Sequence, residues 1–279
     1  MNQRKGEAIV TTNAQASSAH SRSGYAPVNG LEMYYEIHGT GSPLIFIPGG
    51  LMTIDMMGAL LPSLAKTRQV IAIEPQGHGH TFDINRPLTY EHMADDTAAL
   101  ISYLGIERAD VFGFSMGGGV ALQTAIRHPE VTRKLVVASA PFRSDGEYPE
   151  IRALEASFHA DAPMLAPNRD AYLRATPSFE GWLQLVAKVK ASLAVDYDWT
   201  EQVAAAQTPT LIVLGDADTL PSSHAVEMFS LLGGSTAKSA MGGLQQSQLV
   251  ILPGTTHFSI LAHSDLLVAL IAPFLDAPM

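Results

Sequence analysis

The sequence predicts an α/β fold, in which a mostly parallel central sheet is flanked by helices on both faces. Short, continuously apolar runs recur along the chain, as in strands that are buried on both faces. Helical patterns separate these runs, and such alternation is typical of a parallel sheet. The chain has 279 residues, of which 47% are hydrophobic, so it can bury a large core.

The elements are expected in a regular order along the chain. "YAPV" and "LEMYYEIHG" flank Asn29-Gly30 and predict a β-hairpin. Further strands are predicted at "PLIFIPGG", "QVIAIEPQGHG", "ADVFGFSMG", "RKLVVASAP", "PTLIVLGDAD" and "SQLVILPGTTH". Helices are expected near residues 54–66, 89–104, 116–128, 222–232 and 258–276.

Two segments depart from this alternation. Residues 1–23 are rich in Ser, Ala, Thr, Asn and Gln and predict a disordered tail. Residues 142–208 contain no convincing strand, but helical pieces separated by prolines, which predicts an inserted helical cap. The core domain then comprises residues 24–141 and 209–279.

Composition disfavours several classes of function and location. A net charge of −10 argues against binding to nucleic acid or to an anionic membrane surface. The absence of cysteine excludes disulfides, thiol catalysis and thiolate metal sites. No apolar run approaches the roughly 18 residues of a membrane span, and the first residues lack the apolar region of a secretory signal. We therefore expect a cytoplasmic protein. The sequence does not indicate its oligomeric state.

The stretch "GFSMGGG" places Ser115 between glycines, after an apolar strand and before a helical pattern. This context indicates a nucleophile elbow, a sharp turn that exposes one serine at the carboxyl edge of the sheet. Residues Gly113-x-Ser115-x-Gly117 alone are a weak signal. A phosphate loop is disfavoured because no Gly-Lys-Ser/Thr follows.

A serine hydroxyl needs a base, and the base needs an acid that orients it. Downstream, "LIVLGDADTLP" places carboxylates just past a strand, and "VILPGTTHFSIL" places His257 just past the last strand. Three strand ends thus supply Ser115, an aspartate and His257 at one edge of the sheet. This joint pattern is far more specific than any of its parts.

The segments "GFSMGG", "PTLIVLGDAD" and "LPGTTHFSIL" match, in order, the three catalytic segments of the α/β-hydrolase superfamily. Over roughly residues 25–276 the chain resembles this superfamily, specifically its small, capped serine esterase or haloperoxidase-like members. The resemblance implies the α/β-hydrolase fold with a catalytic triad of Ser115, Asp218 and His257. The family's G-x-x-D pattern selects Asp218, and Asp216 is expected to serve the turn.

The resemblance also implies an oxyanion hole of two backbone N–H groups. One belongs to Met116. The other is assigned to Gly50 in "PGGL", with its neighbour Leu51 as the alternative. The family usually has His where this chain has Pro48, and Arg where it has Gln76, and the sequence does not show what replaces their contacts.

Leu51, Trp182 and Phe258 are expected to line the substrate pocket, although core packing competes with this interpretation for Trp182. His78 and His80 suggest a metal site, but no further ligand cluster accompanies them. We expect no metal and no cofactor.

The sequence therefore predicts a serine hydrolase that cleaves small, fairly apolar carboxylic esters through an acyl-enzyme intermediate. Its partners would be the ester and water. The same triad serves a cofactor-free perhydrolase or haloperoxidase, a lactonase, an amidase or a C–C bond hydrolase. A non-catalytic ligand-binding protein on the same fold is a more distant alternative.

Overall fold

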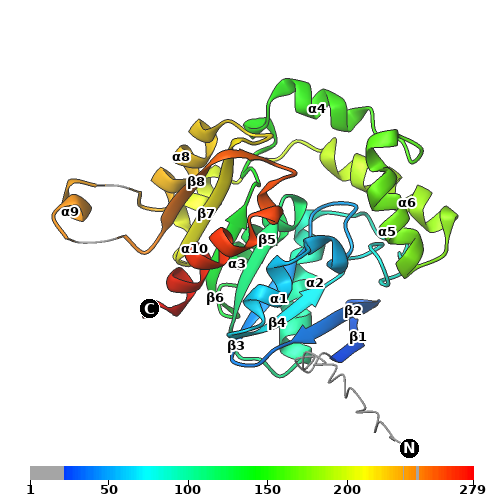
Figure 1. Cartoon of the computed structure of the whole chain (residues 1–279), viewed down its shortest axis with the longest axis horizontal. Helices are drawn as coiled ribbons and strands as arrows, with labels where there is room; N and C mark the ends of the chain where they lie inside the picture. The colour runs from blue at the N-terminus through cyan, green and yellow to red at the C-terminus, as the bar shows by residue number, and fades with distance from the viewer. Residues whose placement is uncertain (1–21, 235, 243–244) are drawn as a thin grey trace, which may run out of the picture.

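The computed structural model describes residues 22–234, 236–242 and 245–279 (Figure 1). Within these ranges, eight strands form one sheet in the order β1-β2-β4-β3-β5-β6-β7-β8. The strands are β1 (Arg22–Val28), β2 (Leu31–His38), β3 (Ser42–Ile47), β4 (Arg68–Ile73), β5 (Ala109–Phe114), β6 (Thr132–Ala138), β7 (Thr210–Ala217) and β8 (Gln248–Thr256).

The pairing confirms a mostly parallel sheet. From β4 to β8 all neighbouring strands run parallel, whereas β1 pairs antiparallel with β2, and β2 antiparallel with β4. Asn29 and Gly30, with φ of 48° and 87°, form the hairpin turn that the sequence predicts.

Helices cover both faces of the sheet. The α-helices are α1 (Leu60–Leu64), α2 (Tyr90–Tyr103), α3 (Met116–Arg127), α4 (Pro149–Ala156), α5 (Ala166–Ala175), α6 (Phe179–Leu193), α7 (Thr200–Ala205), α8 (Ser222–Leu231), α9 (Ala237–Ala240) and α10 (Ser264–Asp276). The 3-10 helices are η1 (Ile54–Met57), η2 (Ser144–Gly146), η3 (Pro163–Leu165) and η4 (Ile260–Ala262).

The core has two layers because successive side chains of a strand point to opposite faces. In β3, Ile45 and Ile47 pack in the layer that contains α2 and α3. Leu44 and Phe46 pack in the layer that contains α1 and α10. This period of two inside a continuous apolar run is what a doubly covered parallel strand requires.

Residues 142–208, which we call the helical insertion, connect β6 to β7 and contain α4 to α7. The segment forms no strand, only an isolated bridge between Arg143 and Asp198. Figure 1 shows α4, α5 and α6 arching over one end of the sheet. The insertion therefore lies where it can contact residues that follow the strands.

Some predicted boundaries were wrong. The tail predicted over 1–23 ends earlier, because Arg22 already pairs with Ile37 in the β1–β2 hairpin; the rest of that segment lies outside the described residues. The helix predicted over 54–66 is divided into η1 and α1 at Gly58, whose φ of 56° interrupts a right-handed helix. The last helix begins at Ser264 rather than near residue 258.

Within residues 22–234, 236–242 and 245–279, no helix is both long and apolar enough to cross a bilayer.

Candidate active site

Ser115 occupies a strained turn between β5 and α3. Its φ of 55° and ψ of −125° lie outside the regions that non-glycine residues prefer. A Cβ on Gly113 would lie 2.0 Å from the Gly117 carbonyl oxygen, and a Cβ on Gly117 would lie 2.3 Å from that of Pro48. Only glycines therefore allow strand and helix to approach closely enough to expose this serine.

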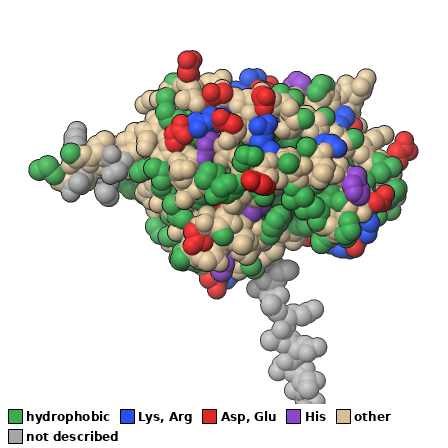
Figure 2. All heavy atoms as spheres, turned by 90° about the horizontal axis from the view of Figure 1, so that it is seen from above, with side chains coloured by type: hydrophobic (Ala, Val, Ile, Leu, Met, Phe, Trp, Pro, Cys, Tyr) green, Lys and Arg blue, Asp and Glu red, His purple; other side chains and the backbone are tan. Residues whose placement is uncertain are grey.

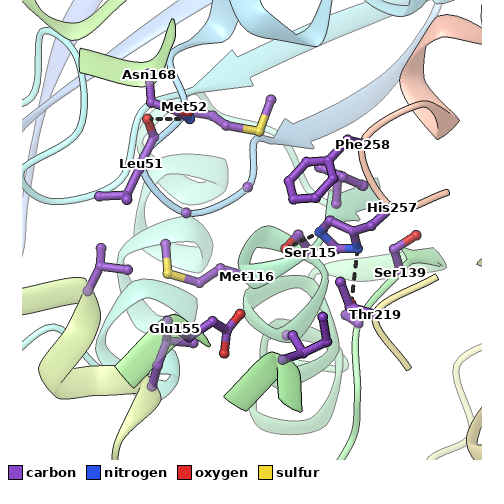
Figure 3. A pocket seen from close by; sticks show the side chains of 18 of the residues that line it. Leu51, Met52, Ser115, Met116, Ser139, Glu155, Asn168, Thr219, His257 and Phe258 are labelled. Carbon is purple, nitrogen blue, oxygen red and sulfur yellow. Dashed lines mark hydrogen bonds between the residues drawn. The ribbon is translucent and has the colours of Figure 1, made fainter. Parts of the chain in front are cut away.

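The structure brings Ser115, His257 and Asp218 into one hydrogen-bonded chain. His257 Nε2 lies 3.1 Å from Ser115 Oγ (Figure 3), and His257 Nδ1 lies 2.7 Å from Asp218 Oδ1. The residues follow or end β5, β7 and β8, whose carboxyl ends meet at one edge of the parallel sheet. Because the carboxylate faces Nδ1, that nitrogen carries the proton, and Nε2 presents its lone pair to the serine.

Asp218 is buried and held by several donors. Its Oδ2 accepts from Ser139 Oγ at 2.6 Å and from the Gly215 N–H at 3.1 Å, and its Oδ1 accepts from the Thr219 N–H at 2.8 Å. Burial by itself would raise the pKa of Asp218, but the hydrogen bond and charge interaction with His257 and these donors outweigh it and lower the pKa below its usual value. The carboxyl group is therefore ionised at neutral pH.

Asp216 lies in a different place. Its Oδ1 accepts a hydrogen bond from the Thr255 N–H at 3.1 Å, so it ties the end of β7 to β8. Of the two aspartates, Asp218 is the one that contacts His257.

Gly50 and Met116 lie against each other beside the serine. A Cβ on Gly50 would be 3.3 Å from Met116 Sδ, and one on Gly49 would be 3.3 Å from Ser115 Cβ. The Leu51 N–H, the alternative oxyanion donor, already donates to His78 Nε2 at 3.1 Å. The Leu51 N–H is therefore already engaged, which argues against Leu51 as the second donor.

The position of Gln76, where the family usually has arginine, is supported by another arginine. Arg86 Nε donates to Gln76 Oε1 at 2.8 Å, while Gln76 Nε2 donates to the Arg86 carbonyl oxygen at 2.9 Å and to Asp83 at 2.8 Å. Arg86 also donates through both terminal nitrogens to the buried carboxylate of Asp96. A guanidinium thus reaches this region from ten residues further along the chain.

His78 and His80 do not converge on a common point. The buried ring of His78 contacts backbone groups of Gln76 and Leu51, whereas His80 contacts Glu74 through Nδ1 at 2.9 Å. Among the described residues, no group of three or more His, Asp or Glu side chains is arranged to hold a metal ion.

A cavity of about 740 Å³ opens onto Ser115 between the sheet edge and the helical insertion (Figure 3). Its wall is mostly apolar. Side chains from the insertion that line it include Ile151, Leu154, Phe158, Met164, Leu165, Val189 and Leu193. Leu51 and Phe258 also line it, and Phe258 is 82% exposed. Figure 2, turned to a second face of the molecule, shows hydrophobic side chains in a band across its middle.

The placement of Trp182 in the pocket was wrong. Trp182 is fully buried (0% exposed), donates from Nε1 to the Ala160 carbonyl oxygen at 3.0 Å, and packs against the ring of Tyr172 at 5.7 Å between centroids. It thus forms the interior of the helical insertion. The same apolar stripe of α6 reaches the cavity further along, at Val189 and Leu193.

Sequence reasoning missed a pair of carboxyl groups in the cavity wall, Glu147 and Glu155. Burial, then repulsion by Glu155, raises the pKa of Glu147 to about 8, and burial also raises the pKa of Glu155. Tyr90 and Tyr197 line the same cavity. Nothing in the spacing of the two glutamates signals this, because one precedes α4 and the other lies within it.

Comparisons with known proteins agree with this architecture. A sequence model of the "Alpha/beta hydrolase family" matches residues 37–270. The chain is similar to a pimeloyl-[acyl-carrier protein] methyl ester esterase of Neisseria meningitidis, with 29% identity across 87% of this chain and 92% of that protein. It is also similar to the putative carbamate hydrolase RutD of Azorhizobium caulinodans, with 28% identity across 72% and 82%.

Among solved structures, the enol-lactonase from Burkholderia xenovorans LB400 superposes with a TM-score of 0.72 at 23% identity, covering 91% of this chain and all (100%) of that one. A likeness at this identity supports the fold. The family model covers most of the chain, and it identifies the protein as a member of the alpha/beta hydrolase family.

Proposed function

We propose that this chain is a serine hydrolase that cleaves small, fairly apolar carboxylic esters through an acyl-enzyme intermediate. The observation that carries the proposal is the continuous chain from Ser115 through His257 to Asp218, which opens into an apolar cavity. The lowered pKa of Asp218 keeps its carboxylate ionised beside His257 Nδ1, and His257 Nε2 faces Ser115 Oγ, as the proposed roles require.

In the first half of the reaction, Ser115 Oγ attacks the ester carbonyl carbon while His257 Nε2 takes the hydroxyl proton. Asp218 holds the imidazole in the required tautomer and stabilises the imidazolium that forms. The negative charge on the carbonyl oxygen is stabilised by the backbone N–H groups of Gly50 and Met116. His257 then protonates the departing alcohol, and the acyl group remains on Ser115.

In the second half, His257 takes a proton from water, which attacks the acyl carbonyl. The tetrahedral intermediate again places its oxyanion at Gly50 and Met116. Collapse returns the proton to Ser115 Oγ and releases the carboxylic acid. Every role is filled by a protein group, so the proposal needs no cofactor.

Two features support an ester as the substrate. The cavity wall offers mainly aliphatic, methionine and aromatic side chains, which suit an apolar acyl or alcohol group. The Neisseria relative is named as a methyl ester esterase. Other similar proteins are named as a non-heme haloperoxidase, from Rhodococcus erythropolis, and as an enol-lactonase, and both activities are alternatives on the same triad.

The test is hydrolysis of p-nitrophenyl acetate and butyrate by the parent protein and by Ser115→Ala. We expect turnover by the parent and loss of nearly all of it in the variant, with an unchanged melting temperature because the hydroxyl is at the cavity wall. Absence of turnover on a panel of esters, lactones, amides and β-diketones would favour a ligand-binding protein. More than a few per cent of parent activity in Ser115→Ala would remove Ser115 from the mechanism.

A further inference from the structure

The two peptide groups that flank Leu51 are each held by a side chain from another segment of the chain. The Leu51 N–H donates to His78 Nε2 at 3.1 Å, and the Leu51 carbonyl oxygen accepts from Asn168 Nδ2 at 3.1 Å (Figure 3). Leu51 has a φ of 61°, in the left-handed region that a branched side chain disfavours. A conformation of this kind persists when surrounding contacts fix it.

The contact from His78 is fixed by burial. The His78 ring is fully buried, and its Nδ1 lies 3.0 Å from the Gln76 carbonyl oxygen, so Nδ1 carries the proton and Nε2 is left as an acceptor. Burial also lowers the pKa of His78 to about 4, which keeps the ring neutral at physiological pH. His78 Nε2 therefore accepts a hydrogen bond from the Leu51 N–H at physiological pH.

The contact from Asn168 is different, because Asn168 lies in α5 of the helical insertion, 117 residues away in sequence. Its effect passes through two peptide groups. The Leu51–Met52 peptide, whose carbonyl Asn168 holds, donates its Met52 N–H to the Gly49 carbonyl oxygen at 3.2 Å. That oxygen belongs to the Gly49–Gly50 peptide, whose other polar group is the Gly50 N–H.

A trans peptide directs its carbonyl oxygen and its N–H to opposite sides. Fixing the Gly49 carbonyl therefore fixes the direction of the Gly50 N–H. Gly49 and Gly50 have little conformational preference of their own, so this direction depends on the contacts at either end.

We propose that Asn168 is a positioning residue for the oxyanion loop (residues 49–51), so that docking of the helical insertion on the sheet edge completes the oxyanion hole. This rests on the proposed function, in which the Gly50 N–H stabilises the oxyanion. Asn168 itself touches no reacting atom. Its influence runs from its amide to the Leu51 carbonyl, and through the Met52 N–H to the Gly49–Gly50 peptide.

The test is Asn168→Leu, which has a similar size and shape but no donor. We expect kcat for p-nitrophenyl esters to fall about tenfold with KM within about twofold, a smaller loss than the 10²–10³-fold that removing an oxyanion donor costs. The loss should be the same for acetate, butyrate and hexanoate. Inhibition by a trifluoromethyl ketone, which forms an oxyanion on the serine, should weaken by the same factor.

Thr176→Val is the matched control. It removes another hydrogen bond from the insertion to the core, from Thr176 Oγ1 to the Gly79 carbonyl oxygen at 2.6 Å, and leaves both Leu51 contacts in place. We expect it to keep the parent kcat. Asn168→Ala serves as a second variant if Asn168→Leu melts below the assay temperature.

The proposal is wrong if Asn168→Leu keeps the parent kcat, if its loss lies in KM or grows with acyl length, or if Thr176→Val loses as much. Ser115→Ala, assayed in parallel, distinguishes failure of the positioning role from failure of the proposed function. If Ser115→Ala is inactive and Asn168→Leu behaves as the parent, only the positioning role fails. If Ser115→Ala stays active, the proposed function fails and the positioning role with it.

Discussion

Asp218 Oδ1 lies 2.7 Å from His257 Nδ1, and the two residues follow neighbouring parallel strands, β7 and β8. The pairing of the strands thus brings a carboxylate and an imidazole together across 39 residues of sequence. The contact favours the His257 tautomer whose Nε2 accepts from Ser115 Oγ, which the proposed mechanism requires.

Asp218→Asn should therefore slow turnover severely. An amide can donate to Nδ1 and so favours the wrong tautomer, and the corresponding change in serine proteases costs about 10⁴-fold in kcat. Steady-state kinetics on p-nitrophenyl butyrate measures the loss. Asp216→Asn is the matched control and should cost far less, because Asp216 contacts only the backbone near Thr255. The reverse ranking of the two variants would show that the acid is misassigned.

Leu193→Ala should change the acyl-chain preference. Leu193 lies at the end of α6 and lines the cavity. Its truncation to alanine enlarges the apolar cavity by the volume of a few methylene groups. We expect the ratio of kcat/KM for octanoate over acetate to rise about tenfold, on the scale of one or two methylenes in an apolar pocket. Superimposable chain-length profiles for variant and parent would contradict this assignment.

Trp182→Ala should act on stability rather than on specificity. Its indole is fully buried within the insertion, and truncation of a buried large aromatic side chain costs about 3–5 kcal/mol. A clear drop in the melting temperature is expected, with the relative kcat/KM across acyl lengths unchanged at temperatures where the variant is folded. A selective increase in kcat/KM for long-chain esters would show instead that Trp182 contributes to the substrate pocket.

Glu147→Gln should stabilise the protein at high pH. Burial is the main cause that raises the pKa of Glu147 from its ordinary value of 4.5 to about 8 in the folded state. Protonation therefore favours folding: the stability that Glu147 contributes is fully present below about pH 4.5 and is lost as pH rises through about 8. Glutamine stays neutral, so the melting temperature of the variant relative to the parent should rise between pH 5 and 9.

Glu150→Gln, an exposed position of α4, makes the same change of charge and is the control for this comparison. A change of 1 kcal/mol in the free energy of unfolding corresponds to a change of about 2–4 °C in the melting temperature of a chain of this size. If the difference in melting temperature between Glu147→Gln and the parent does not change with pH, Glu147 is not held neutral by its surroundings.

The alternation of buried strands and helices could be read from the sequence because it rests on local periodicity. The hairpin at Asn29-Gly30 and the elbow at Ser115 were likewise readable, since each requires residues that tolerate a positive φ or the absence of a side chain. Chain order then placed Ser115, an aspartate and His257 at one edge, because parallel strands align their carboxyl ends, and the family resemblance selected Asp218 as that aspartate.

Only the tertiary structure decided what each buried face contacts. Trp182 and Val189 are seven residues apart on one stripe of α6, and periodicity predicts that both are buried. The helix extends past the cavity, so one end of the stripe packs inside the insertion and the other lines the pocket. The contacts of Leu51 with His78 and Asn168 likewise depend on how separate elements pack, which local sequence does not encode.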